Sequence, residues 1–177
     1  MRVYRPRNQR YNPKYVHKND NSGRFSVNMW AWVSAKSPGV IVHIEERLTS
    51  HIYTRILEEI MMPSVRVVYP EDNFVFQQDN CPVHTAHRVS EWFQNHGINV
   101  LDWPSLSPDL NPIENMWAAV VKSMKRRRVR FENKDQLLTA ISEAWHDLPR
   151  HYFTNLCLSM PNRLLKVYEA NGEMTKY

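Results

Sequence analysis

The segment that begins at Asn111 constrains the fold most, because it carries every local signal of an amphipathic helix with a defined start. Asn111 can cap such a helix, and Pro112 suits its first position. Apolar residues then recur at the three- and four-residue spacing of one helix face, at Ile113, Met116, Trp117, Val120, Val121 and Met124. A helix is therefore predicted here, with Glu114 in its first turn.

The rest of the chain alternates between short apolar segments and amphipathic ones. Strands are predicted over residues 1–5, 25–34, 40–44, 74–76 and 98–101. Helices are predicted over residues 50–62, where Pro63 ends the pattern, over 85–96, around 137–145, and in two shorter segments that start at Pro149 and Pro161. This order predicts an α/β fold in which a mixed sheet is flanked by helices.

Composition narrows the class of protein. With 177 residues, 42% of them hydrophobic, the chain is long enough for one core, and no linker divides it, so we expect a single domain over residues 1–177. The net charge of +5 favours a polyanionic partner such as nucleic acid. No segment is apolar enough to span a membrane, and no secretory signal opens the chain. Together with two cysteines, these features indicate a soluble intracellular protein with reduced thiols.

Two acidic residues, Asp79 and Glu114, are the candidate metal ligands. Asp79 follows the predicted strand 74–76, at the carboxyl end where open α/β sheets place their sites, and 34 residues separate it from Glu114. Two carboxylates brought together would offer Mg²⁺ or Mn²⁺ the oxygen ligands used in phosphoryl transfer. Alternatively, Glu114 completes a capping box and Asp79 forms a turn. Spacing alone does not decide between these interpretations.

The stretch FQQDNCPVHTAHRVSEWFQNHGINVLDWPSLSPDLNPIENMWAAVVKSMKRR resembles the catalytic domain of Tc/mariner-type DDE transposases, most closely between Phe74 and Lys125. The resemblance implies a ribonuclease-H-like fold in which Asp79 and Glu114 are the second and third acids of a triad. The 34-residue interval and a glutamate in the third place point to the Tc branch. The resemblance also implies Mg²⁺ or Mn²⁺ as cofactor, no small-molecule cofactor, DNA as partner, and a pocket lined by Asn80, His84 and Asn111.

The chain departs from the family pattern at its beginning. The first acid of the triad normally lies in a Ser-Asp-Glu-Ser-like phrase on the central strand, and neither Asp20 nor Asp72 has that setting. The helix-turn-helix modules of complete members are also absent. We therefore expect an N-terminally truncated catalytic domain whose sheet lacks its first central strand. Such a chain should bind metal weakly, should not cut or join DNA alone, and should be marginally stable, aggregate or need a partner strand.

Three hypotheses about function follow. The first is a truncated or decayed Tc-type transposase whose ancestral reaction was metal-dependent strand cleavage and transfer of the freed 3′-hydroxyl to target DNA. The second is a domesticated, non-catalytic protein that keeps only DNA or protein contacts. A reading frame that continues upstream of Met1 with the missing phrase would instead indicate a complete enzyme. The third is an unrelated metal-dependent nuclease that takes a further acid from Glu132, Asp135 or Glu143.

Two basic groups are candidates for contact with DNA phosphates. One ends the predicted Glu114 helix and comprises Lys122, Lys125, Arg126, Arg127, Arg128 and Arg130; the other contains Arg5, Arg7 and Arg10 among Tyr4, Tyr11 and Tyr15. The first group also suits nuclear import, which predicts a nuclear location. The alternatives are a solvated helix end and an ordinary strand edge. Either a monomer or a homodimer is compatible with the sequence.

The spacing of His84 and His87 also allows a zinc pair, although no further Cys or His nearby completes a zinc set. The preferred interpretation is that both histidines lie at the start of a helix beside the acidic site.

Overall fold

The computed structural model describes residues 26–104, 107–127, 130–172 and 175. Its described part opens with an antiparallel hairpin of β1 (Asn28–Ala31) and β2 (Ile41–Ile44). The return turn depends on Gly39, which has a φ of +66°. A Cβ at this position would lie 2.0 Å from the backbone oxygen of Trp32, so only glycine fits. The predicted strand over residues 1–5 lies outside the described residues.

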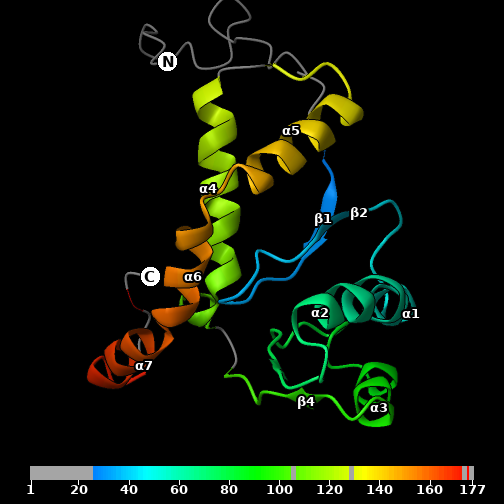
Figure 1. The fold of residues 1–177 in the computed structure, drawn as a ribbon, viewed down its shortest axis with the longest axis vertical. Coiled ribbons are helices and arrows are strands. Elements are labelled where there is room, and N and C mark those ends of the chain that lie inside the picture. The colour runs from blue at the N-terminus through cyan, green and yellow to red at the C-terminus, as the bar shows by residue number, and fades with distance from the viewer. Residues whose placement is uncertain (1–25, 105–106, 128–129, 173–174, 176–177) are drawn as a thin grey trace, which may run out of the picture.

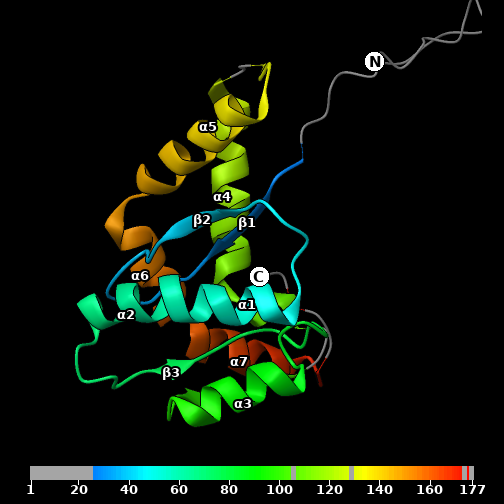
Figure 2. The same cartoon turned by 90° about the vertical axis from the view of Figure 1, so that its right-hand side faces the viewer.

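Both faces of the hairpin are buried because apolar residues follow one another along β1 without polar alternation. Trp30 and Trp32 pack on one face with α1 (Ser50–Ile56), α2 (Met62–Val68) and α3 (His87–Asn95). Met29 and Ala31 pack on the other with α4 (Pro112–Arg127), α5 (Lys134–His146) and α6 (Arg150–Leu158). In Figures 1 and 2 the hairpin lies between these two sets of helices, so the elements form three layers.

The first helical segment does not end at Pro63, as the sequence pattern predicts, but continues to Val68. Between α1 and α2 the chain makes a π-helical turn, η1 (Leu57–Met61), in which the backbone N–H of Met62 bonds to the carbonyl of Leu57. The wider turn places Pro63 in the first turn of α2, where a residue without an N–H is tolerated. The prediction was wrong because it took Pro63 as the end of a helix, whereas Pro63 lies in the first turn of the next helix, α2.

A second, separate sheet carries the Asp79 segment. In it β3 (Val75–Phe76) pairs in parallel with β4 (Asn99–Val100), and α3 forms the crossover. Within the described residues no strand joins β1 to β3, so the mixed sheet exists as two halves. A cavity of about 870 Å³ separates the halves and is lined by residues 29–34 and 73–79.

The C-terminal helices match the predicted ones and hold the start of α4 in place. On α7 (Met160–Glu169), the Arg163 side chain is buried, with 1% exposed. Its guanidinium donates to the Asp109 carbonyl at 2.7 Å, to Asn115 Oδ1 at 2.8 Å and to Ser159 Oγ at 2.9 Å. Asp109 belongs to a 3₁₀ turn, η2 (Pro108–Leu110), directly before α4. The buried Arg163 guanidinium thus holds Asp109 and Asn115, which lie on either side of Glu114 in the chain.

The carboxylate of Asp109 is tied down as well. It accepts hydrogen bonds from the backbone N–H and the hydroxyl of Thr175, at 2.9 Å and 2.8 Å. Burial would raise its pKa, but the bonds from Thr175 outweigh burial and hold the pKa of Asp109 below its usual value. The loop before α4 is therefore anchored by α7 and by the residue at 175. None of the described helices combines the length and apolar character needed to cross a lipid bilayer.

Adjacent valines on α4 test how the helix is held. Val120 is 2% exposed in the second core and Val121 is 47% exposed. Val120→Ala should lower the free energy of unfolding by about 2 kcal/mol, because it removes buried methyl groups and leaves a cavity. Val121→Ala should stay within about 0.5 kcal/mol of the parent chain. Urea unfolding followed by tryptophan fluorescence measures both, and equal losses would contradict the described orientation of α4.

The buried guanidinium gives a second test. Arg163→Met should cost about 3 kcal/mol of unfolding free energy, because the Asp109 carbonyl and the Asn115 amide lose their donor inside the protein. The control is Arg66→Met, since Arg66 makes a comparable two-atom bond to Asp72 but lies at the surface. We expect the control to shift the urea midpoint far less. A larger effect at Arg66 would show that the α7 contact is not important for stability.

Candidate functional site

Asp79 and Glu114 reach a common space from different layers of the fold. Asp79 follows β3, whereas Glu114 lies in the first turn of α4. Both residues line the 870 Å³ cavity between the half-sheets and a smaller cavity of about 300 Å³ next to it. Both side chains are accessible to solvent. The structure therefore places both predicted acids in the lining of the same two cavities.

The turn after Asp79 orients its carboxylate. Oδ1 of Asp79 accepts the backbone N–H of Cys81 at 3.1 Å and lies 2.6 Å from Nδ1 of His84. Within the described residues, no hydrogen bond reaches Oδ2. One oxygen is thus used to fix the side chain, and the other is available to a ligand.

His84 is itself held from behind by two residues. Its ring centroid lies 4.3 Å from that of Tyr53, and its carbonyl accepts from Gln78 Nε2 at 3.1 Å. The Tyr53 hydroxyl donates to Gln78 Oε1 at 2.7 Å. Burial, and then the nearby charge of Asp79, raise the pKa of Tyr53, so the phenol keeps its proton and remains a donor. Tyr53 and Gln78 were not predicted as site residues, because their contacts join helix α1 to a loop 25 positions away.

The two predicted pocket amides tie the loops of the site together. Asn80 Nδ2 donates to the Trp103 carbonyl at 2.7 Å, which connects the Asp79 loop to the segment after β4. Asn111 Oδ1 accepts the backbone N–H of Ile113 at 3.3 Å, as expected of a residue that caps α4. Asn111 also lines both cavities, and Asn80 lines the smaller one. Each amide thus lies at the site with a structural bond of its own.

Other predicted candidates lie elsewhere. Glu132, Asp135 and Glu143 line neither of the two cavities shared by the acids. The further carboxylate there is Asp102, on the wall of the larger cavity. His87 is 95% exposed and faces Glu91 at 4.0 Å, so it does not form a metal pair with His84 in the described structure.

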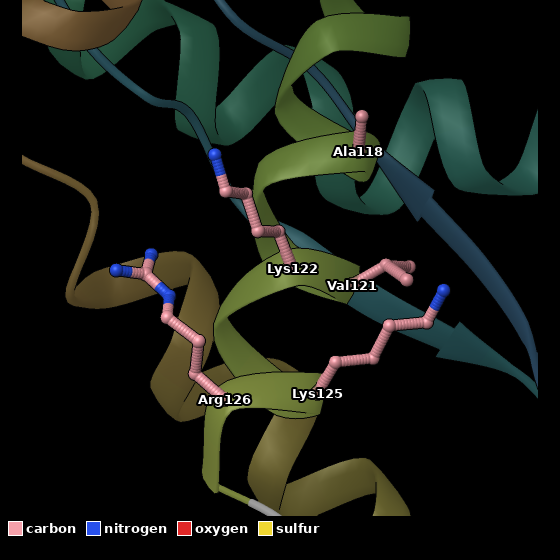
Figure 3. Close-up of a pocket in the computed structure, with 5 residues that line it drawn as sticks. All are labelled: Ala118, Val121, Lys122, Lys125 and Arg126. Atoms are coloured by element: carbon pink, nitrogen blue, oxygen red, sulfur yellow. The ribbon is translucent and has the colours of Figure 1, made fainter.

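The basic end of α4 divides into two kinds of residue. Lys122 and Arg126 extend to one side of the helix and Lys125 to the other, around an open depression of about 610 Å³ that Ala118 and Val121 complete (Figure 3). Arg127 differs, since its guanidinium donates to Glu143 at 2.6 Å and to Asp147 at 2.9 Å. Its charge is therefore compensated. Arg5, Arg7, Arg10 and Arg128 lie outside the described residues.

Known proteins resemble the chain over nearly all of its length. A family model described as a DDE superfamily endonuclease matches residues 2–138. The Tc1 transposase of Caenorhabditis elegans is 38% identical over 177 residues, and the Tcb1 transposase of Caenorhabditis briggsae is 38% identical over 175. Each alignment covers 99% of this chain and 63% of the relative. The chain therefore spans less than two thirds of the length of these relatives.

Solved structures agree on the fold. The catalytic domain of the Mos1 mariner transposase superposes with a TM-score of 0.73 at 19% identity, covering 85% of this chain and 76% of that one. A pre-cleavage Mos1 transpososome gives 0.74 at 17% identity, covering 99% and 52%. The architecture is thus the ribonuclease-H-like one. From the family match, the relatives and this fold, the chain belongs to the DDE endonuclease superfamily as a Tc/mariner transposase catalytic domain.

Proposed function

We propose that this chain serves DNA strand cleavage and strand transfer in transposition, with Asp79 and Glu114 as ligands of a divalent cation. The observation that carries the proposal is that the two carboxylates, from opposite layers of the fold, line the same two cavities. Family membership supports the reaction class. The related Mos1 catalytic domain has been solved with Mg and with Mn, which supports the cation.

The donor set fits Mg²⁺ or Mn²⁺. Both residues offer hard oxygen atoms, and Mg²⁺ needs only one or two carboxylates because it keeps several waters. Bound there, the cation would activate a nucleophile and stabilise the leaving oxygen in phosphoryl transfer. His84 would hold Oδ1 of Asp79 and so direct Oδ2 toward the cavity, while Asn111 and Arg163 would keep the Glu114 turn in place.

The proposed reaction has two steps. In the first, the oxygen of water bonds to a backbone phosphorus of DNA as the bond to the 3′-oxygen breaks, which frees a 3′-hydroxyl. In the second, that hydroxyl attacks a phosphodiester of the target strand, and the bond between this phosphorus and its original 3′-oxygen breaks. Both steps need the acids to be held before substrate arrives, since misplacement by about 1 Å can cost two orders of magnitude in rate.

We further propose that residues 1–177 alone do not complete this reaction. Residues 29–34 and 73–79 line the larger cavity and include β1 and β3, each of which pairs with only one strand within the described residues. In the same region Gln77 Nε2 is buried without a hydrogen-bond partner among the described residues. An extended strand between the two edges would satisfy these groups and could present a third acid beside Asp79. Without that acid, the cation should bind weakly.

The basic face formed by Lys122, Lys125 and Arg126 is the proposed contact for DNA phosphates. These cations lie on α4, the helix whose first turn carries Glu114, so DNA bound along the helix would run toward the acids. A DNA partner agrees with the related Mos1 structures, which include a paired-end complex with transposon end. We also propose a nuclear location, because DNA is the proposed partner. A non-catalytic DNA-binding role is the alternative, because this face does not depend on the acids.

Metal binding provides the direct test of the two acids. Asp79→Asn and Glu114→Gln should each weaken Mn²⁺ binding by roughly tenfold or more, because each removes a charged ligand. Asp135→Asn is the control, as this carboxylate is exposed at the start of α5. Calorimetric titration of the purified chain measures all three. Unchanged affinity in both site variants would refute the proposed metal site.

Catalysis by the chain alone is tested separately, on supercoiled plasmid with Mn²⁺. We expect no nicking above the level of the Asp79→Ala and Glu114→Ala variants. Nicking that both variants abolish would show that two acids suffice and that the chain is an active nuclease.

The proposed DNA contact predicts how the affinity for DNA depends on salt concentration. Replacing Lys122, Lys125 and Arg126 together by glutamine should reduce the slope of log affinity against log salt concentration by about 3 for duplex DNA, because each phosphate contact contributes about 0.9. A charge-matched control replaces Arg47 in the loop before α1, Lys134 on α5 and Arg150 on α6, all outside α4. Fluorescence anisotropy at several salt concentrations gives both slopes. An equal loss in the control would indicate general charge attraction rather than a defined face.

A further inference from the structure

The Asp79 turn holds a second set of donor atoms, which shares only Asp79 with the proposed ligands of the catalytic cation. One ligand atom each from Asp79, Cys81 and His84 lies within 4.8 Å of the other two. All three come from one local turn, in which the backbone N–H groups of His84 and Thr85 bond to the Cys81 carbonyl at 2.8 Å and 3.1 Å. Their proximity therefore depends on a few residues only.

These donors differ in kind from those of the acid pair. A thiolate and an imidazole are ligands for zinc, whereas Mg²⁺ selects oxygen. In a tetrahedral zinc site the bond lengths of about 2.0–2.3 Å put ligand atoms roughly 3.3–3.7 Å apart. The donors of this turn can reach such spacing by side-chain rotation, because Asp79 is 57% exposed and Cys81 is half-buried.

The surroundings favour a preorganised site rather than a chance cluster. The Tyr53 ring packs against the His84 imidazole from the protein side, and the Gln78 amide holds the His84 backbone through its carbonyl. Cys81 and Asp79 both line the 300 Å³ cavity, so an ion can enter from solvent and a fourth position stays open to water. His84 is less exposed than Asp79, with 18% of its side chain accessible against 57%.

We propose that Asp79, Cys81 and His84 form a site for Zn²⁺, with three protein ligands and one water. On binding, the Cys81 thiol gives its proton to solvent and its sulfur bonds to the ion. Asp79 then belongs to the zinc site and is withdrawn from Glu114. Zinc binding itself does not rest on the proposed function; only the resulting competition with Mg²⁺ does.

Cobalt substitution tests the proposal, since Co²⁺ takes zinc sites and a bound thiolate gives it an intense near-ultraviolet charge-transfer absorption. The reduced, purified chain should show this band at one Co²⁺ per chain, and Zn²⁺ should displace it. Cys81→Ser should remove the band and weaken Zn²⁺ binding by roughly tenfold or more. The matched control is Cys157→Ser, the other cysteine, which should keep both. His84→Asn should weaken Zn²⁺ binding while keeping a thiolate band.

The outcomes separate this proposal from the previous one. A band that survives Cys81→Ser, or Zn²⁺ affinity that neither Cys81→Ser nor His84→Asn changes, overturns the zinc site. Glu114→Gln should leave Zn²⁺ affinity unchanged while it lowers Mn²⁺ affinity. If Zn²⁺ binds as described but Glu114→Gln leaves Mn²⁺ affinity unchanged, the zinc site is supported and the proposed catalytic pair is refuted.

Discussion

Burial of the β1–β2 hairpin on both faces is the constraint from which the remaining architecture follows. Because successive residues of β1 point to opposite sides, Trp30 and Trp32 build one core and Met29 and Ala31 the other. Each core contains its own set of helices, and residues from both sets line the 870 Å³ cavity. The turn after β3 belongs to the first set and the start of α4 to the second. The two acids line a common cavity because both layers border it.

The donors at this meeting point are of two chemical kinds, and one residue belongs to both. Asp79 lines a cavity together with Glu114, and in its own turn its ligand atom lies within 4.8 Å of those of His84 and Cys81. The first arrangement depends on the packing of both cores, since 34 residues and a helix crossover separate the acids. The second depends on local backbone bonds alone. Any disturbance of the cores would therefore change the balance between hard and soft cations at Asp79.

Local signals predicted the elements well where the chemistry of a segment decides its structure. Asn111 and Pro112 marked the start of α4 within a residue, because capping needs only neighbouring atoms. Pro63 misled the prediction, since a π turn is set by packing around Leu57 and Met61, both fully buried. Tyr53 behind His84 and Arg163 behind Glu114 could not be anticipated, because their partners lie 25 or more positions away in the chain. Local sequence signals therefore predict the candidate ligands, whereas the residues that support them depend on tertiary contacts.

The anchoring of Asp109 by Thr175 has a practical consequence for anyone who produces this protein. Removing Thr175 would take two hydrogen-bond donors from a carboxylate with only 6% of its surface exposed, beside the 3₁₀ turn. Loss of these bonds would loosen the 3₁₀ turn before α4, and with it the position of Glu114, which lies only five positions beyond Asp109.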